Sequence, residues 1–365
     1  MDLTSVGTAV EHGPGLRQAR VTHECAEGAI GVLWDLGTRM SRRGKAVIEA
    51  VMLVCLFTGT SMAGSTPVLL AQWGTHGAGD GQFDGPEGLA LTADSLVLVA
   101  DTYNHRIQVF DLNGVYQRQF GTYGTGDGQF EYPHGVAVGP DGSIYVTDSG
   151  NSRIQKFSPA GGFLSKWGTR GTGVGQFLGP VGIAVSPDGN VYISDGANSR
   201  ITKCTQDGVV LGAWGTAGCG TTQYYGVYGL ACDDLGRVYA AEGVCCRVHV
   251  TTGDSAFVEM IGSCGSQPGQ LAVPNGVGLD AWRNVYVTDR QLDNLQIFDA
   301  SGTYLDRWGS SGTGDGQFNA PNGVVVDSGG SIYVCDTGNH RIQKFAQPTT
   351  PARTSSWGQV KSIYR

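Results

Sequence analysis

Residues 121–167 read GTYGTGDGQFEYPHGVAVGPDGSIYVTDSGNSRIQKFSPAGGFLSKW, and this stretch recurs along the chain as one unit. Each unit starts with a glycine that follows a large apolar residue. The six opening glycines lie 47 residues apart, at positions 74, 121, 168, 215, 262 and 309. A fixed period of this length indicates a repeat architecture in which each unit packs against its neighbours.

Four short strands are predicted within each unit, from runs of β-branched and aromatic residues bounded by turn residues. In the second unit these strands are 135–138, 143–147, 153–157 and 163–167. Glycine, at 59 of 365 residues, is enriched and gathers in the connections. Four strands in up-and-down order form a propeller blade. We therefore predict an all-β, six-bladed β-propeller with four antiparallel strands per blade.

Closure of this ring requires an outer strand for the last blade, because an unpaired edge invites aggregation. Two segments are candidates, 68–73 before the first complete unit and 353–357 after a stretch rich in proline and threonine. We expect the amino-terminal segment to close the ring. The propeller domain then covers 64–345, and 346–365 form a carboxy-terminal tail.

A second recurring motif lies before the third strand of most units. It reads Asp101-Thr-Tyr-Asn-His-Arg-Ile in the first unit and starts again at Asp148, Asp195 and Asp336. Together with a preceding Pro-x-Gly turn, this Asn-x-Arg-Ile core resembles the signature of the NHL repeat family of six-bladed propellers. The resemblance covers about residues 68–345. Units four and five depart from it, with Cys-Cys-Arg at 245–247 and Leu-Asp-Asn at 292–294.

The recurring Asp and Arg of this motif are expected to fix the loop, because chemistry needs an asymmetric group of differing residues. Function is therefore sought where the repeat varies. The residue between Pro and Gly of the turn is expected at the mouth of the central channel, and it is Glu87, His134, Val181, Tyr228, Asn275 and Asn322 in the six units. We expect the five polar residues of this rim to bind a ligand. The alternative is that they are ordinary loop residues.

Glu87 and His134 are also weak candidates for catalysis, as an acid–base pair that acts on an ester or lactone. No Gly-x-Ser-x-Gly nucleophile motif accompanies them. The peptide-amidating lyase, an NHL-like enzyme, holds zinc through several histidines around its channel. In this sequence only His134 has a rim position, so the resemblance does not extend to that zinc site. No metal and no cofactor are therefore expected, and an enzyme is the weaker alternative.

The first 63 residues are predicted to lie outside the ring. Residues 40–45 are basic, 50–57 are an apolar run, and 61–63 form a small-x-small cleavage site, as in a secretory signal peptide at 40–63. The apolar run is too short for a membrane span, although a buried strand or a short anchor is an alternative. Residues 1–39 are expected not to belong to the mature protein. We expect a secreted, periplasmic or cell-surface protein.

The charge of the ring limits its partners. Removing residues 1–63 leaves 24 minus 6, or 18, Lys and Arg against 32 minus 6, or 26, Asp and Glu, a net charge of −8. Some NHL propellers bind RNA, but that function needs a basic surface, as does adsorption to anionic lipid. The expected partner of this monomeric ring is a protein, a peptide or a glycan, with no nucleic acid.

Seven of the nine cysteines follow residue 64, in a compartment that permits disulfides. Cys219 and Cys264 are predicted in the loops that enter blades four and five, and Cys245 and Cys246 in a loop of blade four. These loops emerge on one face, so two disulfides are expected, with a zinc site as the alternative. The other three are expected to fill apolar space inside the blades, namely Cys204, Cys232 and Cys335.

The function expected from these residues is a binding or scaffold propeller that presents its loop face to a partner. A lyase or hydrolase at the channel mouth is the first alternative. A second alternative is a substrate-recognition propeller like those of NHL-containing ubiquitin ligases. No Cys/His array with RING spacing precedes the ring, so these residues do not support ligase activity.

Overall fold

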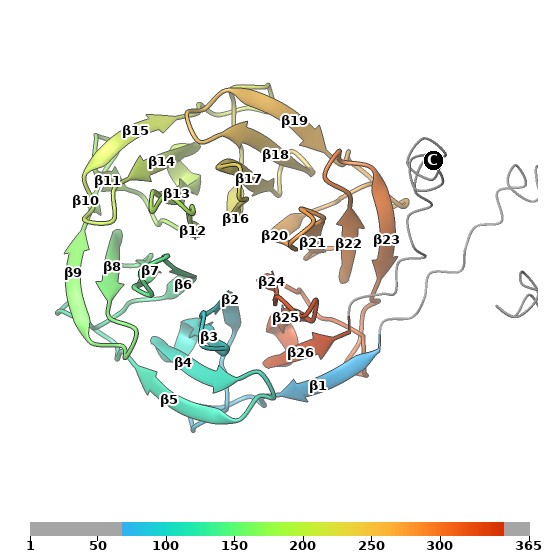
Figure 1. The fold of residues 1–365 in the computed structure, drawn as a ribbon, viewed down its shortest axis with the longest axis horizontal. Helices are drawn as coiled ribbons and strands as arrows, with labels where there is room; N and C mark the ends of the chain where they lie inside the picture. The colour runs from blue at the N-terminus through green and yellow to red at the C-terminus, as the bar shows by residue number, and fades with distance from the viewer. Residues whose placement is uncertain (1–67, 347–365) are drawn as a thin grey trace, which may run out of the picture. The chain divides into compact units, whose positions relative to one another are not determined.

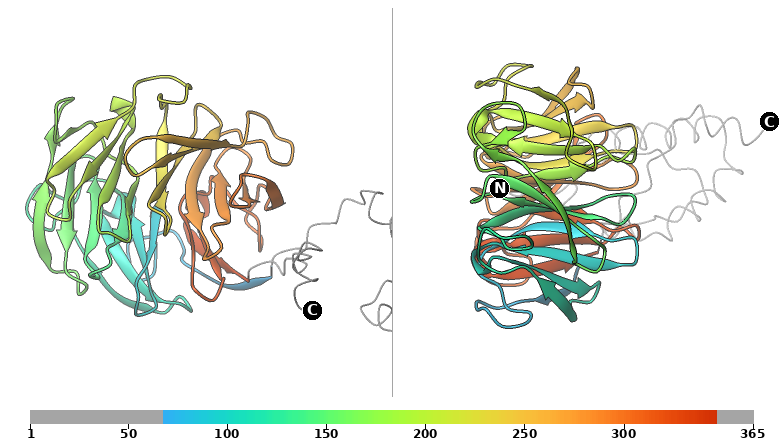
Figure 2. Two further views of the ribbon diagram at one scale, coloured as in Figure 1. Left: turned by 45° about the horizontal axis from the view of Figure 1, so that its top comes forward. Right: turned by 90° about the vertical axis from the view of Figure 1, so that its left-hand side faces the viewer.

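The computed structural model describes residues 68–346, which form a ring of six four-stranded antiparallel sheets (Figure 1). The predicted signal peptide, the upstream segment and most of the tail lie outside the described residues. The predicted all-β, six-bladed propeller is confirmed. Figure 2 shows the same ring from the side, where it is wider than it is thick. Within residues 68–346 no helix is long and apolar enough to cross a bilayer.

The first three blades follow one another along the chain, each starting with its innermost strand. Blade 1 contains β2 (Pro86–Leu91), β3 (Leu96–Asp101), β4 (Arg106–Asp111) and β5 (Tyr116–Phe120). Blade 2 contains β6 (Pro133–Val138), β7 (Ile144–Asp148), β8 (Arg153–Phe157) and β9 (Phe163–Trp167). Blade 3 contains β12 (Ile183–Val185), β13 (Val191–Asp195), β14 (Arg200–Cys204) and β15 (Val210–Trp214).

The last three blades repeat this order, except that blade 6 takes its outer strand from the start of the ring. Blade 4 contains β16 (Val227–Cys232), β17 (Arg237–Glu242), β18 (Arg247–Thr252) and β19 (Phe257–Ile261). Blade 5 contains β20 (Pro274–Leu279), β21 (Val285–Asp289), β22 (Asn294–Phe298) and β23 (Tyr304–Trp308). Blade 6 contains β24 (Val324–Val326), β25 (Ile332–Asp336), β26 (Arg341–Phe345) and β1 (Leu69–Trp73).

Short elements complete the ring. Strand β1 pairs antiparallel with β26, as expected for the amino-terminal segment. The remaining elements are the parallel pair β10 (Thr169–Arg170) and β11 (Gln176–Phe177) and three 3-10 helices, η1 (Thr102–Asn104), η2 (Gly196–Asn198) and η3 (Thr337–Asn339).

The apolar core is divided among the six junctions between blades. In the junction of blades 1 and 2, Ile107 and Val109 of β4 pack with Val146 of β7 in one buried cluster, and five further clusters fill the other junctions. Strands β7 and β8 are buried throughout, whereas β9 alternates between half-buried and exposed residues. Strands covered on both faces are therefore buried at every residue, including the polar residues of β8, and the outer strand alternates.

The glycine of the Pro-x-Gly turn lies where neighbouring innermost strands approach each other most closely. A Cβ added at Gly229 would lie 2.6 Å from the carbonyl oxygen of Asn275, and one added at Gly323 would lie 2.5 Å from that of Glu87. In all six units the added Cβ would meet the carbonyl oxygen of the next blade's rim residue, at Gly88, Gly135, Gly182, Gly229, Gly276 and Gly323. Only glycine allows the innermost strands to approach one another this closely. We call this narrow part of the channel the neck and these six residues the neck glycines.

The recurring Asp and Arg of the NHL-like motif form a buried network, which supports their expected structural role. Asp148 is fully buried, and it accepts hydrogen bonds from Arg153 Nε at 2.7 Å and from the Asn151 side chain at 3.0 Å. The Arg153 guanidinium also donates to the carbonyl oxygens of Thr125 and Gly126. The pair thereby fixes the loop that enters the blade.

Replacing a neck glycine is expected to destabilise the ring. In the Gly323→Ala variant the new Cβ meets backbone atoms that cannot turn away, so the free energy of unfolding should fall by about 3 kcal/mol. The control is Gly212→Ala in β15, where nothing lies within 4 Å of the added Cβ. That variant should unfold within about 1 kcal/mol of wild type. Urea denaturation measures both, and equal stabilities would contradict the close approach.

Breaking the buried ion pair is expected to lower the free energy of unfolding far more than breaking an exposed one. Arg153→Ala leaves Asp148 buried without its cation and should lower the free energy of unfolding by about 3–5 kcal/mol. Lys166 lies 2.6 Å from Asp127, but their side chains are 42% and 58% exposed. Lys166→Ala should therefore cost less than about 1 kcal/mol in the same urea experiment. A mild effect of Arg153→Ala would argue against the structural role of the motif.

Candidate functional site

The mouth of the central channel brings together five of the six variable turn residues. Glu87, His134, Val181, Tyr228 and Asn322 line one cavity of about 300 Å³. Deeper in the channel the wall is apolar, with residues such as Leu89, Val136 and Ile183 from the inner strands. The cavity therefore has a polar rim above an apolar wall.

Asn275 holds the same turn position, but its side chain is enclosed, and its predicted contact with a ligand stays a prediction. Its side chain is only 2% exposed and does not line the cavity. Strand β20 is buried over its first five residues, whereas β6 is half-exposed at its second and third. Asn275 is thus buried at the position where His134 is half-exposed.

Local backbone geometry turns the rim residues toward the channel. The pairing of β6 with β7 shifts its register between Pro133 and Val136, and such a bulge re-aims the side chain beside it. The Thr147 hydroxyl accepts a hydrogen bond from the Gly135 N–H and donates to the Val181 carbonyl oxygen at 2.8 Å. Ser194 in blade 3 and Thr288 in blade 5 make the same two contacts, so in these three blades a hydroxyl ties the turn to the rim of the next blade.

Glu87 and His134 contact each other directly at the rim. His134 Nδ1 and Glu87 Oε2 are hydrogen-bonded, and the two side chains are 25% and 12% exposed. The carboxylate holds the imidazole in a fixed orientation while part of each side chain stays open to a ligand. The pair can accept or donate a proton or a hydrogen bond, which suits binding as well as acid–base chemistry.

An exposed aromatic group lies on the same face as the rim, although sequence reasoning missed it. Tyr103 of η1 and Tyr132 have ring centroids 5.9 Å apart, and His105 lies 4.9 Å from both Tyr132 and Tyr123. The three tyrosines are 54%, 41% and 65% exposed, in the order Tyr103, Tyr132 and Tyr123. The hydroxyl of Thr102, beside Tyr103, donates to the Pro133 carbonyl oxygen, one residue from His134.

The two disulfides join the four cysteines that were expected to be neighbours. They connect Cys219 to Cys245 and Cys246 to Cys264. Cys245 takes the place of Asn151, whose side chain donates to the Gly124 carbonyl oxygen in blade 2. The Cys219–Cys245 bond therefore fixes by a covalent link the loop that other blades fix by a hydrogen bond.

The remaining described cysteines are unsuited to nucleophilic chemistry. Cys204 and Cys335 are buried and Cys232 is half-buried. Burial raises the pKa of Cys204 to about 12, and burial also raises the pKa values of Cys232 and Cys335 above the ordinary value. A thiol that stays protonated is a poor nucleophile, so these three cysteines serve as apolar filler.

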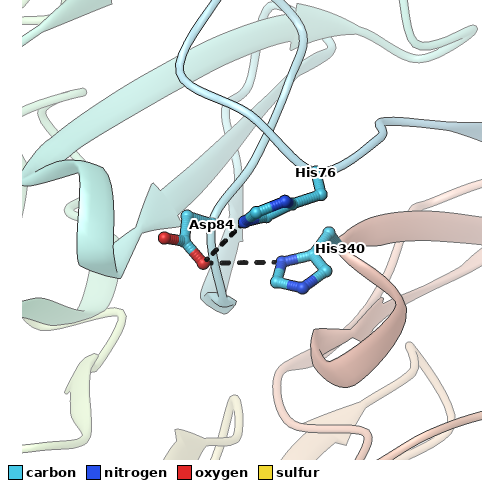
Figure 3. Close-up of side chains that lie close together, drawn as sticks. All are labelled: His76, Asp84 and His340. Carbon is cyan, nitrogen blue, oxygen red and sulfur yellow. Dashed lines mark ion pairs between the residues drawn. The ribbon is translucent and has the colours of Figure 1, made fainter.

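A histidine cluster outside the channel is the second feature that sequence reasoning missed. His76, Asp84 and His340 come together where blade 6 meets blade 1 (Figure 3). His76 and His340 are far apart in the sequence and meet only because the ring closes. The 47-residue period contained a signal for this contact. Four periods after His76 lies Cys264, and two periods before His340 lies Cys246, and these two cysteines form a disulfide.

Comparison with known families identifies the repeats. The NHL repeat model matches residues 83–110, 130–157, 177–204 and 318–345, which lie in units one, two, three and six. "Protein brain tumor" of Drosophila melanogaster is 46% identical over 46 residues, which are 13% of this chain and 4% of that protein. The chain thus spans a small part of that relative, and the match supports a shared repeat.

Solved structures share the architecture at low sequence identity. The virginiamycin B lyase from Staphylococcus aureus superposes with a TM-score of 0.51 at 15% identity, over 71% of this chain and 79% of the lyase. An auxiliary nutrient binding protein from Bacteroides thetaiotaomicron gives a TM-score of 0.56 at 14% identity, over 78% and 75% of the two chains. Identities this low establish a common fold.

The two disulfides predict the number of free thiols in the folded protein. A chain that starts at Gly64 holds seven cysteines, and seven minus the four in disulfides leaves three thiols. Unfolding without a reductant should therefore expose three thiols to a colorimetric thiol reagent, and unfolding with a reductant, later removed, should expose seven. Four or more thiols in the unreduced sample would contradict the two bonds.

Proposed function

Starting from a six-bladed propeller that carries NHL repeats, a domain type that typically mediates protein interaction, we propose that this chain is an exported binding module. Its partner is a protein, a peptide or a glycan, and it binds on the face where Glu87 and His134 lie. The ring acts as a monomer. One observation carries the proposal, namely that the polar rim of the channel is chemically mixed while the surrounding framework repeats.

The rim offers several kinds of contact within one small opening. Glu87 supplies a carboxylate, His134 an imidazole, Tyr228 a phenol and Asn322 an amide around the cavity. A few convergent polar groups above an apolar wall are typical of ligand sites. A cavity of about 300 Å³ suits one side chain, one chain end or one sugar ring rather than a whole folded partner.

The aromatic group extends this site over the rim. Tyr103, Tyr123 and Tyr132 are exposed around His105 on blades 1 and 2. Tyrosine combines a large apolar ring with a hydrogen-bonding hydroxyl and loses little conformational entropy on binding. We expect one part of the partner to enter the channel mouth and an adjacent part to lie on these rings.

Export fits the cysteine chemistry and the predicted leader. Disulfides persist in oxidising compartments and are rare in the cytosol. The pairs Cys219–Cys245 and Cys246–Cys264 support a secreted, periplasmic or cell-surface location, as does the predicted signal peptide at 40–63. The nutrient binding protein with the same fold is one example of a propeller described by its binding role.

A lyase or hydrolase is the second candidate function, and one contact favours it. The hydrogen bond between His134 and Glu87 is the arrangement needed for a general base and its orienting carboxylate. The virginiamycin B lyase shares the fold. However, the half-buried Cys232 of the channel wall has a raised pKa, so this thiol supplies no nucleophile.

Binding to peptide and glycan arrays tests the proposed site. The variant Glu87→Gln/His134→Asn keeps a polar side chain at both positions but removes the charge and the acid–base chemistry. It should lose about 10–100-fold in affinity for the best array ligand, because hydrogen bonds to charged groups contribute about 1.5–3 kcal/mol. Titration calorimetry measures this loss.

A control on the outer surface shows whether a loss of affinity is specific to the rim or follows from any surface substitution. Leu211 of β15 is 54% exposed, like Tyr103, but belongs to the outer strand of blade 3. Leu211→Ala should bind as wild type. Unchanged affinity of the rim variant would contradict the proposed site. Turnover of ester or lactone substrates by wild type, abolished in the rim variant, would favour the enzyme instead.

A further inference from the structure

We infer that His76, Asp84 and His340 bind a divalent transition-metal ion of the zinc class, which links the last blade to the first. Two imidazoles and one carboxylate form a ligand set that Zn²⁺ uses, with water at the fourth position. The cluster lies at the blade junction and is separate from the channel residues. The site is therefore independent of the proposed partner.

The distances suit a single ion. Asp84 Oδ1 lies 3.6 Å from His76 Nε2 and 3.7 Å from His340 Nδ1, and the ligand atoms all lie within 4.8 Å of one another (Figure 3). Ligands about 2.1 Å from a tetrahedral ion are about 3.4 Å apart. Small side-chain movements therefore suffice to enclose the ion.

The repeat register supplies independent support, because a covalent bond occupies the same positions at another junction. His340 lies 94 residues, or two periods of 47, after Cys246, and Cys264 lies 188 residues, or four periods, after His76. Cys246 and Cys264 form a disulfide where blade 4 meets blade 5. Side chains at these two positions thus meet across a junction closely enough to be linked.

The third ligand distinguishes the closing junction from the others. The residues equivalent to Asp84 in the later units are Glu131, Leu178, Tyr225, Ala272 and Asn319. At the junction of blades 1 and 2, Glu131 is accompanied by His105 but by Tyr123 in place of His76. Among the described junctions, only that of blades 6 and 1 combines two histidines with a carboxylate.

A structural role for His340 alone is the competing explanation. Its Nδ1 accepts a hydrogen bond from the Gly85 N–H at 3.1 Å, and His105 Nδ1 accepts one from the Tyr132 N–H at 3.1 Å. Metal binding at His340 Nδ1 would replace that hydrogen bond. This explanation does not account for His76 and Asp84. Because His105 accepts the same hydrogen bond but has no second histidine beside it, His105 serves as a matched control.

The site is accessible to solvent and lies beside the strand pair that closes the ring. The side chains of His76, Asp84 and His340 are 67%, 39% and 28% exposed, so an ion and its water can enter. His76 follows the end of β1 by three residues, and His340 directly precedes β26. Strands β1 and β26 form the antiparallel pair that completes blade 6, so the ion would hold the two strands together at the end where Trp73 pairs with Ile342.

Zinc titration of the untagged, EDTA-dialysed chain tests the inference. Calorimetry should give one Zn²⁺ per chain, and His76→Gln and Asp84→Asn should each weaken binding by more than about tenfold, since even the loss of an outer-shell partner costs that much. His105→Asn should bind zinc as wild type does. Mg²⁺ and Ca²⁺, which prefer oxygen ligands, should not bind measurably.

Hydrogen exchange of residues 69–73 gives a second readout. Zn²⁺ should slow amide exchange in β1 of wild type and of His105→Asn but not of His76→Gln. His76 is exposed, so its replacement leaves the ring folded, as the thermal midpoint without metal should show. Three results would overturn the inference: no zinc binding by wild type, binding by His76→Gln and Asp84→Asn as tight as by wild type, or exchange in β1 of wild type that zinc leaves unchanged.

Discussion

The structure depends on the close approach of six innermost strands around the channel. Each Pro-x-Gly turn puts a glycine against the carbonyl oxygen of the next blade's rim residue, and a Cβ there would meet backbone atoms. At the closing junction the Gly323 N–H also donates to the Glu87 carbonyl oxygen at 2.8 Å. The residue before each glycine is therefore held in place by the same contact that closes the neck.

This constraint separates architecture from function. Positions that recur in most blades, such as the neck glycine and the buried Asp148–Arg153 pair, serve packing and loop geometry. Departures from the repeat gather on the face where the channel opens. They comprise the rim beside Glu87 and His134, the tyrosines of blades 1 and 2, the two disulfides, and the histidine cluster of the closing junction.

The sequence predicts most of the fold because its period is strict and each strand is bounded by turn residues. The predicted strands 153–157 and 163–167 coincide with β8 and β9. Site prediction is less complete, because side-chain contacts across junctions are not periodic. Asn275 shares the rim position but is buried, and His76 meets His340 only through ring closure. Tyr123 and Tyr132 become neighbours of His105 only in the folded ring.

A crystal structure of the wild-type ring with its best array ligand tests the central claim most directly, namely that function lies where the repeat varies around the channel. The account predicts ligand density at the channel mouth, in contact with Glu87 and His134 and extending toward Tyr132. Density confined to the outer strands, or to positions that are the same in every blade, would contradict it.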